Sequence, residues 1–158
     1  MPSEEKQFNR QGLIAALQKG WKHYLSCLAA LSDEEQARYA REQGFLHVQD
    51  VLVHIFAWWE RSMQRTAWLL SGPPLPPAKG HPLFLLDMDE FNADVVAQHE
   101  QWSRAASEEK FAATLAAFER FLIDLPETAL EHEHIQTWMR IDTIDHYEAH
   151  RPPNGPAL

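Results

Sequence analysis

The sequence predicts an all-α protein, an antiparallel four-helix bundle with short extra helices. Apolar residues recur at three- and four-residue spacing in several long stretches, which is the pattern of helices with one buried face. No stretch of useful length alternates between apolar and polar residues as a strand would. Facing apolar stripes of this kind pack together as a bundle.

The first half of the chain contains two long predicted helices. Apolar residues recur at helical spacing over 13–31, and Ser32 with Glu35 then forms a capping-box pattern that predicts a short helix. A second long helix is expected over about 48–70. The proline-rich segment 71–77 ends it, because successive prolines remove donors and block further turns.

The second half of the chain predicts three more helical segments. One covers about 88–102, and another begins near Ser107, whose side chain can cap it, and is broken by Pro126. The last helix is expected over about 135–150. The residues after it, 152–158, have no evident packing partner, so we expect them to fray.

The composition bounds the class of protein. A chain of 158 residues with 45% apolar content fits a single domain over 1–158. The net charge of −9 argues against a nucleic-acid or anionic-membrane partner. One cysteine, Cys27, excludes an internal disulfide, and no apolar run has membrane-spanning length. These features favour a cytoplasmic protein, with Cys27 buried in the core.

Histidines on two predicted helices form a candidate metal site. His146 and His150 lie four residues apart, so their rings project from one face of the last helix. In a chain with nine histidines such a pair arises easily by chance. His54 flanks the apolar stripe of the helix over 48–70 and supplies a third ligand, unless it is a boundary histidine bonded to a backbone carbonyl. Three imidazoles leave open positions on the ion, as catalytic sites do.

Two carboxylates precede the candidate ligands by one helical turn. Asp50 stands four residues before His54, and Asp142 stands four residues before His146. Either carboxylate can accept the second ring N–H and fix the tautomer, as outer-shell partners do. Asp142 is alternatively a fourth ligand or a base, or simply a solvated or capping residue.

The motif Val-Leu-Val-His-Ile-Phe-Ala-Trp-Trp-Glu around His54, with Asp-His-Tyr-Glu-Ala-His ending at His150, resembles the DinB/YfiT-like superfamily of four-helix bundles. The likeness covers nearly the whole chain, including the Leu-Ser-Asp-Glu-Glu segment. Residues 91–100, Phe-Asn-Ala-Asp-Val-Val-Ala-Gln-His-Glu, are similar to the ClbS/DfsB-like branch. Members of that branch often lack the complete histidine triad, which this sequence retains.

The resemblance implies a bacterial metal-binding bundle, often a homodimer, that carries one divalent ion, most often nickel or zinc. It implies a metal-dependent transferase of the thiol S-transferase type, with a low-molecular-weight thiol as cosubstrate, or a hydrolase acting on a small reactive compound. The alternative is a non-catalytic protein that binds or sequesters a metal or small molecule, or a bundle that serves only for dimerisation. The sequence does not identify catalytic residues for either the enzyme or the binding protein.

Other polar residues are given structural roles. Tyr147 lies on the opposite side of the last helix from His146, so we expect it to pack in the core. Glu60 and Asn92 can approach the mouth of the site, although ordinary solvent-exposed polar positions explain both adequately. The Glu131–His134 segment holds half of a di-iron motif, but a di-iron site needs a second copy that the sequence does not contain.

Overall fold

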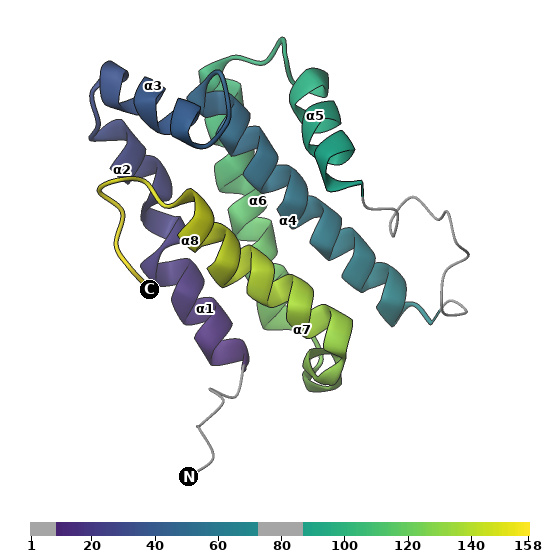
Figure 1. Ribbon diagram of the computed structural model, residues 1–158. Helices are drawn as coiled ribbons and strands as arrows, with labels where there is room; N and C mark the ends of the chain where they lie inside the picture. The colour runs from purple at the N-terminus through teal and green to yellow at the C-terminus, as the bar shows by residue number, and fades with distance from the viewer. Residues whose placement is uncertain (1–8, 73–86) are drawn as a thin grey trace.

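The computed structural model describes residues 9–72 and 87–158, and within these ranges the chain is helical with no strand (Figure 1). The prediction of an all-α protein is therefore confirmed. The expectation for the proline-rich segment falls mostly outside the described residues. In chain order, the helical elements are α1 (Arg10–Lys19), η1 (Trp21–His23), α2 (Tyr24–Ala29), α3 (Asp33–Glu42), α4 (Val48–Leu70), α5 (Met88–Gln98), α6 (Arg104–Asp124), η2 (Glu127–Glu131), α7 (Glu133–Arg140), η3 (Ile141–Asp145) and α8 (His146–His150).

The longest helices pack around one another and leave the last helical segment against two of them. α4 pairs with α6 along its length, and α1 packs against both α6 and η3. α7 and η3 contact α4, so the continuous α7–η3–α8 segment lies beside both α1 and α4 (Figure 1). None of the helices in the described ranges combines the length and apolar character needed to cross a bilayer. This arrangement sets α4 opposite the histidines of the last segment.

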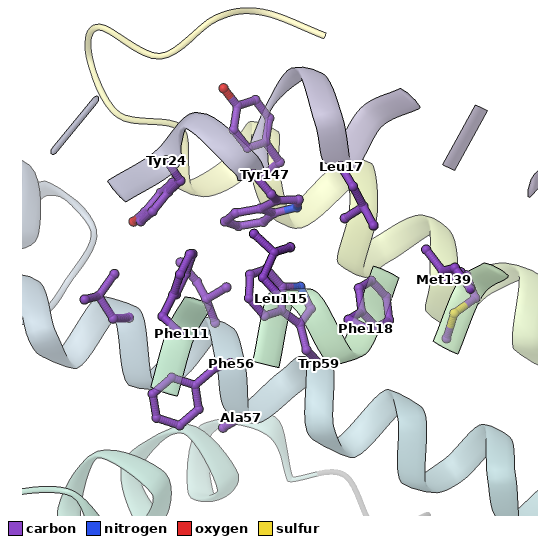
Figure 2. Close-up of a cluster of buried hydrophobic side chains, with 14 of the residues drawn as sticks. Leu17, Tyr24, Phe56, Ala57, Trp59, Phe111, Leu115, Phe118, Met139 and Tyr147 are labelled. Carbon is purple, nitrogen blue, oxygen red and sulfur yellow. The ribbon is translucent and has the colours of Figure 1, made fainter. Parts of the chain in front are cut away.

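Aromatic side chains from four elements fill the core (Figure 2). The Trp59 ring on α4 lies 4.9 Å from that of Phe111 on α6 and 5.0 Å from that of Trp21, as measured between centroids. Trp21 in turn meets Tyr147 of α8 edge-on at 5.3 Å. Tyr147 is fully buried, so its predicted packing role is confirmed. The cluster fixes one side of the last helical segment.

The first predicted helix is interrupted at Gly20, where α1 ends and η1 begins. A Cβ atom at this position would lie 2.9 Å from two ring atoms of Tyr147 and 3.0 Å from Leu158. Glycine therefore allows the close approach of α8 to the N-terminal helices. The helical periodicity over 13–31 persists through the break, which is why the sequence pattern does not reveal it.

Helix starts agree with the sequence at some positions and differ at one. α4 has the bounds expected for it, and the Ser32–Glu35 capping box of α3 is formed. The predicted cap at Ser107 is wrong: α6 begins at Arg104, and the Ser103 side chain accepts from the Ala106 N–H. Ser107 is buried inside the helix, where its hydroxyl donates to the Ser103 carbonyl.

The C-terminal tail is packed, which corrects the expectation that 152–158 fray. The Tyr147 hydroxyl donates to the Pro156 carbonyl at 2.6 Å, and the Asn154 amide donates to the carbonyl of Cys27 at 2.8 Å. Leu158 packs against the core. The tail thus supplies the acceptor for the buried Tyr147 hydroxyl, and its Leu158 side chain covers part of the hydrophobic core. Cys27 itself is half-buried rather than buried.

Candidate metal centre

Three histidine side chains meet between α4 and α8. The Nε2 atom of His54 lies 3.1 Å from Nε2 of His146 and 3.2 Å from Nε2 of His150. One ligand atom from each residue lies within 4.8 Å of the others, an arrangement that could hold a metal ion. The convergence that sequence spacing left open is therefore present, and His54 points at the pair on the last helix rather than at a backbone carbonyl.

The two separations from His54 fit tetrahedral ligands of a divalent ion, and the ligand atoms of His146 and His150 lie within 4.8 Å of each other. Metal–nitrogen bonds of about 2.0–2.1 Å to imidazole place neighbouring tetrahedral ligand atoms roughly 3.3–3.4 Å apart. The observed separations of 3.1 and 3.2 Å are close to that spacing. Three imidazole nitrogens are a donor set that suits zinc, nickel, copper and iron.

A π turn directly precedes the histidine pair. The η3 segment, Ile141–Asp145, is wound as a π-helix, a form that often occurs at functional sites. The backbone carbonyl of Asp142 accepts hydrogen bonds from the indole N–H groups of Trp21 at 3.0 Å and Trp59 at 3.3 Å. The aromatic core thus holds the turn from which His146 projects.

Gln43, at the C-terminal end of α3, orients His150. Its Oε1 atom lies 2.7 Å from Nδ1 of His150. Because an amide oxygen only accepts, the ring proton sits on Nδ1 and the lone pair of Nε2 faces the centre. Gln43 is not among the site residues predicted from the sequence. No local spacing could have found it, since α3 and α8 are brought together only by the fold.

Burial keeps all three rings neutral. It lowers the pKa of His54 and of His150 to about 4, and the proximity of His150 adds to the effect on His54. The pKa of His146 falls to about 2, again chiefly through burial and then through the other two rings. At neutral pH the rings therefore offer lone pairs, the form in which imidazole binds metals.

Asp142 lies beside the triad with a buried carboxyl group. Its Oδ1 atom is 3.9 Å from Nδ1 of His146, which is longer than a hydrogen bond, so the predicted tautomer-fixing bond is not formed. At 2% exposure the residue is neither solvated nor a helix cap. Burial raises the pKa of this carboxyl to about 7, although a hydrogen bond from Ser62 and the charge of Arg65 act in the opposite direction.

Asp50 has a different role from the one predicted. Its carboxylate accepts from the backbone N–H of His47 at 3.2 Å and thereby closes the first turn of α4. Backbone N–H groups at a helix start lack intrahelical acceptors, and a nearby carboxylate supplies one. Nδ1 of His54 has no hydrogen-bond partner within the described ranges. Asp50 therefore does not orient His54.

A cavity of about 320 Å³ opens next to the triad. His54, His146 and Asp142 are part of its wall, and so are Trp58 and Arg65 of α4 and Trp138 of α7. This volume lies in the range of small-molecule sites. Two of the three candidate ligands thus border a space that a small molecule can enter. Arg65 and Trp138 are not among the site residues predicted from the sequence, because their spacing on their own helices resembles that of ordinary surface and core residues.

Of the two residues expected near the mouth of the site, Asn92 lies in the cavity wall and Glu60 does not. Asn92 lines the cavity, and its amide oxygen accepts from the Trp58 indole at 2.8 Å. Glu60 instead pairs with Lys110 at 2.6 Å and is not part of the cavity wall. The sequence prediction therefore holds for Asn92 alone.

Comparisons of the chain with protein-family models, with curated protein sequences and with solved structures find no match. The superfamily resemblance of the sequence accordingly stays a prediction.

Proposed function

We propose that this protein is a metal-dependent enzyme of the DinB/YfiT-like four-helix-bundle type, a thiol S-transferase or a hydrolase that acts on a small reactive compound. The observation that carries the proposal is the convergence of three Nε2 atoms at the wall of a cavity of about 320 Å³. A closed structural site would use four protein ligands, whereas three histidines leave a position for a reactant.

His54, His146 and His150 are the residues that would hold the ion, and nickel and zinc are the ions we propose. A divalent ion there supplies a positive charge that acidifies a water or thiol and polarises an electrophile. The neutral rings do not offset this charge. Gln43 supports the arrangement by holding the proton of His150 on Nδ1.

The cavity wall supplies the other groups that such a reaction needs. Asp142 offers a carboxyl group whose raised pKa, about 7, suits it to take up or release a proton near neutral pH. Trp58 and Trp138 provide apolar surface that excludes water from a bound compound. We give Asp142 the role of general base as part of this proposal.

Elemental analysis of the purified protein tests the metal site. We expect about one divalent ion per chain in the wild type and its loss in a His146→Ala, His150→Ala double variant. A His23→Ala, His134→Ala double variant is the matched control, because it removes two histidines outside the triad and should keep the ion. Equal metal content in wild type and the triad variant would refute the site.

Turnover separates the two classes of function. The metal-loaded protein is incubated with cysteine and 1-chloro-2,4-dinitrobenzene to test thiol transfer. A second sample is incubated with p-nitrophenyl acetate to test hydrolysis, and the product of each reaction is followed by absorbance. Turnover that the triad variant lacks supports an enzyme. Metal binding without turnover of either probe supports the alternative, a sequestration protein. The burial of His54, which is 6% exposed, favours that alternative because a buried ligand would retain an ion. From the resemblance we also propose a homodimer, and light scattering tests this by measuring the molar mass in solution.

A further inference from the structure

Arg65 is a buried cation in the wall of the same cavity. The residue is only 4% exposed, yet it belongs to none of the ion pairs formed within the described ranges. Its Nε atom is inaccessible to water and has no hydrogen-bond partner in the same part of the chain. Buried guanidinium groups are normally paired, so this side chain is in an unusual state for one that serves structure alone.

The groups around Arg65 are aromatic. The guanidinium carbon lies 4.6 Å from the ring centroid of Trp138 and 5.9 Å from that of Trp58. Stacking on a ring occupies the face of the guanidinium but leaves its in-plane N–H groups for another partner. Those N–H groups form a fork that matches the two oxygens of a carboxylate.

The carboxylates in the cavity wall form no close pair with Arg65, although its charge acts on Asp142 from a longer distance. Asp142 and Asp89 line the cavity with it, but neither comes within 4 Å of the guanidinium. The three histidines add no negative charge. Among the residues that the structure describes, none gives Arg65 a carboxylate within 4 Å, so a carboxylate ligand would supply a close counter-ion.

We propose that Arg65 is the anion-recognition residue of the cavity and that the ligand is a small carboxylate on a flat, aromatic body. The carboxylate pairs with the guanidinium, the body lies against Trp58 and Trp138, and the remaining end reaches His54 and His146 in the same wall. Only the contact with His54 and His146 rests on the proposed function, since pairing with Arg65 needs no metal.

Calorimetric titration with benzoate and benzamide tests this assignment. The two probes have the same shape, but only benzoate carries the anion. We expect the wild type to prefer benzoate at least about tenfold, since each tenfold step corresponds to about 1.4 kcal/mol. Arg65→Gln should abolish the preference, and Arg65→Lys should keep part of it because the charge remains without the fork.

Arg61→Gln is the matched control, because it removes the same charge one helical turn away, outside the cavity wall. It should leave the preference unchanged. An equal loss in both variants would reduce the effect to general electrostatics and overturn the assignment, as would a preference that survives in Arg65→Gln. Absence of benzoate binding to the folded wild type would overturn it equally.

The titrations are run on metal-free and on zinc-loaded protein, and the zinc affinity of Arg65→Gln is measured beside them. Unchanged zinc affinity with lost benzoate preference supports the assignment. Failure to bind zinc in the wild type would refute the proposed metal site alone, because the metal-free titration still decides the role of Arg65.

Discussion

The two sides of the last helical segment, Glu133–His150, differ in whether the buried polar atoms beside them have hydrogen-bond partners. On the core side, Tyr147 and Met139 are fully buried, and the Tyr147 hydroxyl has an acceptor. The indoles that pack there donate to the carbonyl of Asp142. On the site side, buried polar atoms lack partners within the described ranges: Nδ1 of His54, Nδ1 of His146, Oδ2 of Asp142 and Nε of Arg65.

This difference shows which side the fold leaves for a ligand. Native proteins pair nearly all buried polar groups, because an unpaired group costs about 1–3 kcal/mol. The core side of the segment follows this rule. On the other side, four buried atoms without a partner in the described ranges belong to residues of one cavity wall, whereas Nε of Arg10 and Oγ1 of Thr66, which also lack one there, lie outside that wall. Variants on the two sides should therefore fail in different ways.

The largest effect should come from the core side. Trp59→Ala removes a fully buried ring and the hydrogen bond to the Asp142 carbonyl, so we expect a loss of about 3–5 kcal/mol in the free energy of unfolding. Urea denaturation followed by circular dichroism measures it. Ile123→Ala, at a residue that is 43% exposed, is the control and should stay within about 0.5 kcal/mol of wild type. A loss below about 1 kcal/mol for Trp59→Ala would contradict the account of the core.

On the site side, His54→Ala should impair metal binding more than folding. We expect zinc affinity to fall at least about 100-fold, beyond the 10–100-fold typical of an outer-shell partner. The free energy of unfolding of the metal-free protein should fall less than in Trp59→Ala, because the imidazole is smaller than the indole and its Nδ1 atom has no hydrogen-bond partner within the described ranges. Competition with a chromophoric chelator measures the affinity, with exposed His23→Ala as control. Comparable affinities in both variants would remove His54 from the site.

Acid should destabilise the metal-free protein through the site side. The pKa of His146 is about 2 when folded and about 6.5 when unfolded, so the unfolded chain binds more protons below pH 6.5 and stability falls with pH. One such histidine contributes about 2 kcal/mol of loss between pH 7 and pH 5. Urea denaturation at both pH values should show a smaller loss in His146→Ala.

Asp142 should have the opposite effect on the pH dependence of stability in the metal-free protein. Its pKa is about 7 when folded against 3.8 in the reference state, so the folded chain binds the extra proton between these values and stability rises as pH falls. Asp142→Asn removes this contribution and should lose more stability than wild type from pH 7 to pH 5. Identical pH dependence in wild type, His146→Ala and Asp142→Asn would show that neither group is buried as described.

The smallest effect concerns the link from α3 to the site. Gln43→Leu removes the acceptor of the His150 ring N–H, and we expect zinc affinity to fall about tenfold. Gln43→Glu keeps an acceptor and should retain or raise the affinity. If both variants bind zinc like the wild type, Gln43 does not orient His150.

The sequence predicts the parts of the molecule that depend on local patterns. The bounds of α4 follow from a continuous apolar stripe, and the capping box of α3 from Ser32 and Glu35. The candidate ligands were also found, since four-residue spacing puts His146 and His150 on one helical face. The convergence of His54 with them needed the packing of α4 against the last segment.

Other features depend on contacts between distant residues. The Tyr147 ring lies against Gly20, where α1 ends, and the Tyr147 hydroxyl donates to the Pro156 carbonyl of the tail. Asp50 caps its own helix instead of reaching His54, a competition that spacing alone cannot decide. Arg65 becomes notable only when its burial is known.

X-ray absorption at the zinc K edge reports the ligands of a bound ion without depending on activity. In zinc-loaded wild-type protein, we expect three imidazole ligands at about 2.0–2.1 Å, and two in each single variant His54→Ala, His146→Ala and His150→Ala. Three imidazoles in any of these variants, or fewer than three in the wild type, would contradict a metal centre built from this triad.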